Sequence, residues 1–193
     1  DPWYLEGVRS LEYDPDKAKA LLREARAVGT QVKIIANLNT ALARETVQVI
    51  QEAWNTVGFK ATLDLLDTAP FLAAAKEGNF DGRLGGYTYR YDPNDFYARN
   101  LHSQSEWNRS NSGWYNERYD RLVEEAKHTL DVARRKALYT EAQNIINAEL
   151  PHFHLHDVVR TTAAVKELQG YQPGVGGALT YQGGGLRTAY LKA

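Results

Sequence analysis

Apolar residues recur along this chain at two different spacings. Positions three to four apart predict amphipathic helices over residues 15–28, 40–57, 68–77, 119–130 and 132–149. Short β-prone runs predict strands over 31–36, 61–67, 80–88 and 152–165. Because the first strands alternate with helices, this order predicts an α/β fold with a mixed, mostly parallel sheet flanked by helices.

Individual residues mark where several of these elements begin and end. Asp14 suits the N-cap of the first helix, and Pro15 suits its first turn. Gly58 is expected to end the helix over 40–57, since glycine adopts the left-handed conformation that closes many helices. Seven of the fifteen glycines lie between residues 170 and 185, which predicts a loop-rich tail.

Composition narrows the classes of protein to consider. The 193 residues carry 23 Lys and Arg against 24 Asp and Glu, and this balance argues against a dedicated nucleic-acid binder. The absence of cysteine excludes disulfides, thiolate metal sites and a cysteine nucleophile. The chain also lacks methionine, so Asp1 is not a translation start, and we expect a processed chain or an excised fragment.

Aromatic and basic residues gather in a polar, turn-rich stretch around residues 87–119. This stretch holds six of the twelve tyrosines and two of the four tryptophans. In extended backbone, Tyr87, Tyr89 and Tyr91 point to one side while Arg90 points to the other. Aromatic walls with a few polar groups are typical of a small-molecule cleft, although tyrosines packed under a loop at a sheet edge are the alternative.

Five segments resemble signatures of the family 5 extracellular solute-binding proteins. They are Tyr13-Asp14-Pro15-Asp16-Lys17-Ala18-Lys19-Ala20-Leu21-Leu22, Gln51 through Phe59, Asp92-Pro93-Asn94-Asp95-Phe96, Asn111 through Asp120, and Arg134 through Pro151. Members of this family are peptide-, opine-, oligosaccharide- and nickel-type binding components of ABC importers. The matches stand in the family's order, so the chain is identified as a member.

This resemblance implies a fold and a division of the chain. The fold is a lobe of the type II periplasmic-binding-protein class. Residues 1–158 would form the C-terminal ligand-binding lobe, and residues 159–193 would form the hinge crossover and a tail that returns toward the first lobe. On this resemblance, we expect the first lobe, the second small domain and the signal peptide of the family to lie outside this sequence.

The resemblance also implies a function in binding rather than catalysis. The protein would hold a small polar solute, such as a peptide, opine or sugar conjugate, in a cleft between two lobes. It would act outside the cytoplasm, in the periplasm or at the cell envelope, and would deliver the solute to a membrane permease without a cofactor or nucleic acid. The effector-binding domain of a transcription regulator stays open as an alternative.

The candidate ligand residues follow from the aromatic stretch and from the matched segments. They are Tyr87, Tyr89, Arg90, Tyr91, Asp92, Trp107, Trp114 and Tyr115. Peptide-binding members place an aspartate near Arg90 to pair with the peptide amino group. A guanidinium prefers a carboxylate, so Arg90 favours opines or sugar conjugates over simple peptides.

Two of these residues have structural alternatives. Arg90 could instead pair with Asp92 or Asp95 and stiffen the turn. Trp114 could pack over the start of the helix that contains Tyr119.

Three histidines alternate near the end of the predicted lobe. On a strand, His152, His154 and His156 would share one face, and three imidazoles can bind Zn²⁺ or Ni²⁺. Three such positions on a single strand strain tetrahedral geometry, so a polar layer near the hinge is the favoured interpretation, and a small metal hydrolase is the remaining alternative. The sequence contains no Gly-x-Ser-x-Gly motif and no phosphate-binding loop.

Overall fold

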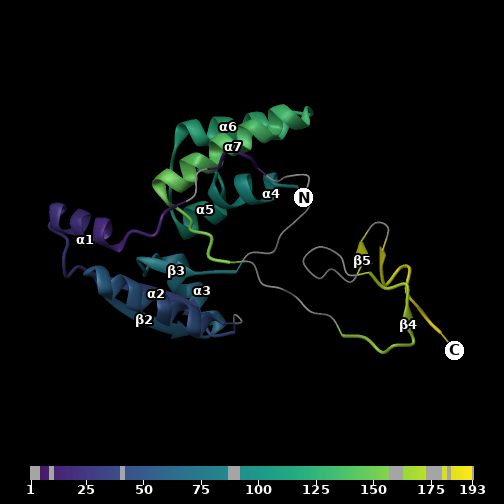
Figure 1. Cartoon of the computed structure of the whole chain (residues 1–193), viewed down its shortest axis with the longest axis horizontal. Helices are drawn as coiled ribbons and strands as arrows, with labels where there is room; N and C mark the ends of the chain where they lie inside the picture. The colour runs from purple at the N-terminus through teal and green to yellow at the C-terminus, as the bar shows by residue number, and fades with distance from the viewer. Residues whose placement is uncertain are drawn as a thin grey trace.

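A computed structural model describes residues 5–8, 11–39, 42–86, 92–156, 163–172, 180–181 and 184–192. Figure 1 shows a sheet with its helices on one side of the molecule and a group of helices next to it. We call these the sheet layer and the helical layer. The chain passes from the sheet layer to the helical layer after residue 86.

The sheet layer is built on three parallel strands in the order β2-β1-β3. Strand β1 (Gln31–Asn37) is central and pairs along its whole length with β2 (Lys60–Leu66). Its other edge pairs with the short β3 (Gly82–Leu84). Parallel neighbours require crossover connections, and these are supplied by helices α2 (Ala43–Val57) and α3 (Thr68–Glu77).

The alternating side chains of β1 explain why helices cover both faces of this sheet. Ile34 and Ala36 pack with Val47 of α2, whereas Ile35 packs on the other face with Phe71 and Ala75 of α3. All of these side chains are buried. The predicted α/β fold with a parallel sheet between helices is therefore confirmed.

The helical layer contains one three-residue helix, α4 (Asn94–Phe96), a π-helical turn, η1 (Tyr97–Leu101), and the short helix α5 (Glu106–Asn111). The longer α6 (Glu117–His128) and α7 (Val132–Glu149) pack against each other. Tyr119 and Tyr139 are fully buried in this core, and the Tyr119 hydroxyl donates a hydrogen bond to the Tyr97 carbonyl at 2.9 Å. Burial also raises the pKa of Tyr119.

The predicted element ends are confirmed at several places. Asp14 caps α1 (Pro15–Glu24) by accepting a hydrogen bond from the Lys17 amide at 2.8 Å, and Gly58 follows α2 with a φ of 125°. The prediction of a strand over 152–165 is wrong for the described residues 152–156 and 163–165, which have no partner strand. The short helices between residues 94 and 111 were not predicted, because their sequence is too polar to show a helical apolar stripe.

The C-terminal part holds two small antiparallel pairs. Strand β4 (Leu168–Gln169) pairs with β7 (Tyr190–Leu191), and β5 (Thr180–Tyr181) pairs with β6 (Gly184–Gly185). The division at residue 158 into lobe and returning tail stays a prediction.

The cap at Gly58 gives a test of the sheet layer. A Cβ there would make only ordinary contacts, with Val28 and Leu22 at 3.6 and 3.8 Å, so the cost of Gly58→Ala comes from the positive φ. We expect a loss of about 1–2 kcal/mol in the free energy of unfolding, measured by urea denaturation. Gly85→Ala, at an exposed position with open space around it, is the control. Equal effects of the two substitutions would contradict this account.

Candidate ligand-binding site

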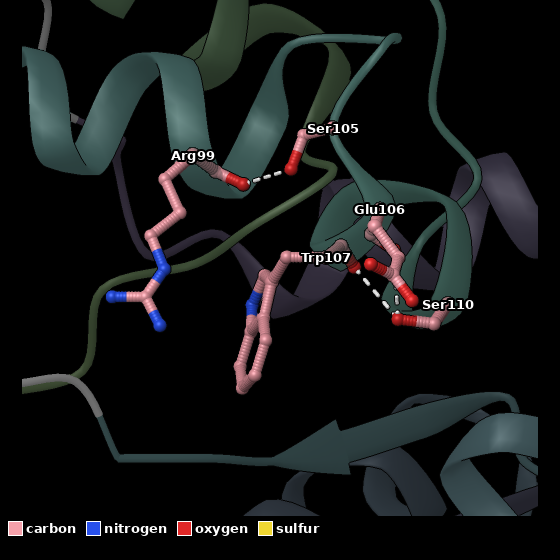
Figure 2. A pocket seen from close by; sticks show the side chains of 5 residues that line it. All are labelled: Arg99, Ser105, Glu106, Trp107 and Ser110. Atoms are coloured by element: carbon pink, nitrogen blue, oxygen red, sulfur yellow. Dashed lines mark hydrogen bonds between the residues drawn. The ribbon is translucent and has the colours of Figure 1, made fainter.

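A shallow pocket opens on the helical layer where η1 and α5 face the sheet layer. It has a volume of about 360 Å³ and is lined by Arg99, Ser105, Glu106, Trp107 and Ser110. Figure 2 shows the side chains of Arg99 and Trp107 extending from their helices in the same direction. Trp107 is 42% exposed, which is unusual for so large an apolar side chain. The pocket thus offers an aromatic surface next to a cation.

The hydroxyl groups of this pocket are engaged with the backbone. Ser105 donates a hydrogen bond to the Arg99 carbonyl, and Ser110 donates to the carbonyls of Glu106 and Trp107 at 2.9 and 3.2 Å (Figure 2). The bond from Ser105 ties the start of α5 to η1, and the bonds from Ser110 lie within α5. The groups left to contact a ligand are the indole of Trp107 and the charged ends of Arg99 and Glu106.

Asn108 fixes the backbone that carries Trp107. Its side chain is fully buried, and its amide donates hydrogen bonds to the carbonyls of Leu101, His102 and Trp114 at 3.2, 3.3 and 2.7 Å. Its carbonyl accepts a hydrogen bond from the Ser112 hydroxyl at 2.5 Å. The Asn108 side chain therefore links the end of η1, at Leu101 and His102, to the residues that follow α5, Ser112 and Trp114.

Arg83 of β3 reaches the same tryptophan from the sheet layer. Its guanidinium carbon lies 4.7 Å from the Phe71 ring centroid and 5.7 Å from the Trp107 ring centroid. The guanidinium carbon of Arg99 also lies 5.7 Å from the Trp107 centroid. Cations near aromatic faces are stabilised by the ring quadrupole, so Trp107 brings two positive charges together at the junction of the layers.

Burial affects the charge of the Arg83 guanidinium. Its Nε is buried without a hydrogen-bond partner, and burial lowers the pKa of its guanidinium. Within the described ranges, Arg83 forms no ion pair with an acidic side chain, whereas Arg99 has Asp95 at 4.0 Å. Arg83 is consequently a partly desolvated charge that has no counter-ion among the described residues.

Asp92, a predicted ligand residue, contacts a different arginine. Its two carboxylate oxygens accept hydrogen bonds from Arg135 of α7 at 2.7 and 2.9 Å, and one of them also caps the Asn94 amide at 2.8 Å. These bonds lower the pKa of Asp92. The geometry gives Asp92 the role of a strut between the turn and α7, while its contact with a ligand stays a prediction.

Trp114 and Tyr115, which were both predicted to face the ligand, lie in different surroundings. Trp114 packs edge-to-face on Tyr119 at 4.8 Å between ring centroids, and its indole N–H donates to Glu149 at 2.7 Å. This is the packing alternative that the sequence left open. Tyr115 is 66% exposed and free to contact other molecules. The structure places Trp107, but not Trp114, at the pocket.

The other four predicted ligand residues, Tyr87, Tyr89, Arg90 and Tyr91, lie outside the described residues. Their roles stay predictions. In the sequence, these residues follow β3 and stand a few positions after Arg83.

The histidines do not form a cluster. His152 packs edge-to-face on Phe96 at 5.5 Å, and burial, with a smaller contribution from His154, lowers the pKa of His152. In the parts of the chain that the structure describes, no three His, Asp or Glu side chains are arranged to hold a metal ion. Metal binding by His152, His154 and His156 stays untested, as does the metal-hydrolase alternative.

Two important residues were not predicted from the sequence, namely Arg83 and Asn108. A charged residue within a strand that is packed on both faces is a signal that could have drawn attention to Arg83. Asn108 offered no such signal, because it stands in a run of polar residues.

The chain thus combines an α/β fold around a parallel sheet with a pocket on its helical layer. A profile of the bacterial extracellular solute-binding proteins, family 5 (middle region), matches residues 1–109. The chain belongs to this family.

Relatives with known names resemble most of the chain. A di/tripeptide-binding protein 1 of Pseudomonas aeruginosa is 31% identical over 157 residues, which cover 77% of this chain and 29% of the relative. A dipeptide-binding protein of Escherichia coli is 28% identical over 175 residues, which cover 87% of this chain and 33% of the relative. The chain spans about a third of the length of these relatives.

Solved structures have the same fold. The dipeptide-binding protein of Pseudoalteromonas in complex with Met-Leu superposes with a TM-score of 0.80 at 26% identity, covering 99% of this chain and 38% of that protein. The periplasmic binding protein DppA of Helicobacter pylori, in complex with a peptide, gives a TM-score of 0.73 at 20% identity, with 99% of this chain and 37% of that protein covered. Among the described residues, none of the helices has the length and apolar character needed to cross a membrane.

The buried amide of Asn108 gives a test of how the site is held. Asn108→Ala leaves three backbone carbonyls without their donor, and we expect it to lower the free energy of unfolding by about 1–3 kcal/mol. Arg109→Ala, on the exposed side of the same helix, is the matched control and should change little. Urea unfolding followed by tryptophan fluorescence measures both. If Asn108→Ala were as mild as its control, Asn108 would not hold the loop.

The pair of Asp92 and Arg135 predicts a pH dependence. The pKa of Asp92 is lowered in the folded state, so its charge stabilises the fold above the unfolded pKa of about 4, and this stabilisation disappears as the pH falls through the folded pKa. Asp92→Asn should therefore cost up to about 1 kcal/mol at pH 7, because the pair is partly exposed, and almost nothing at pH 2.

Asp64→Asn, at an exposed position on β2 with no ion pair among the described residues, is the control for this measurement. Its effect on stability should be near zero at both pH values. A penalty for Asp92→Asn that stays constant between pH 7 and pH 2 would contradict the ion pair.

Proposed function

We propose that this chain is a ligand-binding lobe of a solute-binding protein that captures short peptides or related small polar solutes for an ABC importer. The observation that carries the proposal is the half-exposed Trp107 of the helical layer, which lies beside the guanidinium groups of Arg83 and Arg99. Aromatic surface with a few oriented charged groups is typical of small-molecule sites.

Peptides are favoured as the solute class by the relatives. The proteins of Pseudomonas aeruginosa and Escherichia coli described above are named as di/tripeptide- and dipeptide-binding proteins. Arg90, where peptide-binding members have an acid, keeps opines and sugar conjugates as finer alternatives. All of these solutes can present a carboxylate or several hydroxyl groups to arginine side chains.

Binding would act through closure of two lobes. Residues 1–158 supply one wall of the cleft, and residues 159–193 return toward the other lobe. A solute that contacts both walls stabilises the closed form by its higher affinity for that form, and a membrane permease recognises the result. The protein therefore works outside the cytoplasm, in the periplasm or at the cell envelope.

The transcription-regulator alternative has less support. The named relatives are described as peptide-binding proteins, which favours the importer component over the effector domain of a regulator.

The two-lobe mechanism predicts that affinity depends on the second wall. Calorimetry with di- and tripeptides should give a dissociation constant weaker than about 100 µM for this chain, because a ligand loses the contacts of the other lobe. The two-lobe protein that contains this chain should bind at least one of the same peptides about a hundredfold more tightly. The proposal fails if the two-lobe protein binds no peptide, opine or sugar conjugate, or if this chain already binds with submicromolar affinity.

A further inference from the structure

We propose that Gln51 and Asn55 of α2 close the outer edge of β2 and prevent it from pairing with a second copy of this chain. In the part of the chain that the structure describes, β2 is bonded to β1 on one side and to no strand on the other. A strand edge of this kind presents N–H and C=O groups to which a strand of another molecule can bind. This role of the two residues is independent of the solute that the protein binds.

The pairing of β2 with β1 determines which backbone groups lie on the outer edge. The Lys60 amide donates a hydrogen bond to the Thr30 carbonyl at 2.8 Å, so the backbone groups of Lys60 point toward β1. The direction of these groups alternates along a strand. The N–H and C=O groups of Ala61, Leu63 and Leu65 therefore point away from β1 and form the outer edge.

Both backbone groups of Ala61 are bonded to side chains of α2. The Ala61 amide donates to Asn55 Oδ1 at 2.8 Å, and the Ala61 carbonyl accepts from Gln51 Nε2 at 2.8 Å. Gln51 and Asn55 stand four positions apart, so they project from the same side of the helix. They take the place of a neighbouring strand at Ala61. The outward groups of Leu63 and Leu65 have no such partner among the described residues.

The charges on β2 make its edge complementary to a second copy of itself. Lys60, Thr62 and Asp64 are exposed, and neither Lys60 nor Asp64 forms an ion pair within the described ranges. In a two-fold antiparallel pairing with Thr62 opposite its own copy, Lys60 of each chain would lie opposite Asp64 of the other. Opposite charges at such positions stabilise a sheet, so this is the register that a second copy would favour.

This favoured register needs the backbone groups of Ala61. With Thr62 opposite its copy, the hydrogen-bonded pairs would join Ala61 of one chain to Leu63 of the other. The two side chains of α2 occupy the Ala61 groups and close this pairing. A register centred on Asp64 avoids Ala61, but it places two carboxylates opposite each other, which is unfavourable. The most complementary pairing is therefore the one that α2 blocks.

Removal of the two side chains should allow the chain to dimerise through β2. The test variant is Gln51→Ala with Asn55→Ala, because alanine favours the helix. The control is Gln48→Ala with Glu52→Ala, which removes two exposed side chains at the same spacing on the same helix. Sedimentation velocity measures the dissociation constant of a dimer with twice the 21.7 kDa mass of one chain. Relative to the unsubstituted chain, we expect this constant to fall at least about tenfold in the test variant and to stay unchanged in the control. Equal constants for the two variants would overturn the proposal.

Charge reversal identifies the surface through which the test variant dimerises. Added to that variant, Lys60→Asp places like charges opposite each other and should weaken dimerisation at least about tenfold, while Lys60→Asp with Asp64→Lys should restore it. A dimer that is insensitive to these changes uses another surface and would overturn the proposal.

The single substitutions decide the matter if the double variant does not fold. Gln51→Ala and Asn55→Ala each free one backbone group of Ala61. Each should lower the dissociation constant of the dimer by a smaller factor than the double variant. If neither lowers it, the two side chains do not guard the edge and the proposal is wrong.

Discussion

The contact between a guanidinium and two aromatic rings joins the two layers of this lobe. The sheet layer closes its own apolar clusters around β1, and the helical layer closes another around Tyr119 and Tyr139. Where α3 and β3 meet α5, Arg83 lies between Phe71 and Trp107. A junction that is held by a cation between rings, rather than by aliphatic packing, can admit a polar ligand without opening a hydrophobic core.

The rest of the helical layer fixes one side of that junction. Asn108 holds the loop that carries Trp107, and the pair of Asp92 and Arg135 ties the turn after residue 91 to α7. Because these contacts are internal to the helical layer, the proposed two-lobe mechanism would leave motion on binding to the connection with the other lobe. Rigid walls joined by a hinge are what a binding protein needs to couple closure to occupancy.

The sequence predicted the sheet layer well because its elements follow simple periodic patterns. The ends of α3 match the predicted range, and Gly58 closes α2 as expected. The ends of α7, in the helical layer, also match the predicted range. In the helical layer, α5 is held by side-chain hydrogen bonds from Asn108 and Ser110, which hydrophobic periodicity cannot reveal.

The site was predicted less completely because its contacts join distant parts of the chain. Asp92 and Arg135 are 43 positions apart in the sequence, so the partner of Asp92 could not be inferred from local spacing. Arg83 reaches Trp107 only in the folded chain, where α5 packs against α3. Trp107 lies at the pocket and Trp114 packs on Tyr119, while the ligand contact of each stays a prediction.

The most direct test of this account is a crystal structure of the two-lobe protein with a bound dipeptide. The account predicts that the peptide lies between the lobes and contacts the indole of Trp107. A peptide bound in the cleft without any contact to Trp107 or to the other residues of its pocket would contradict it.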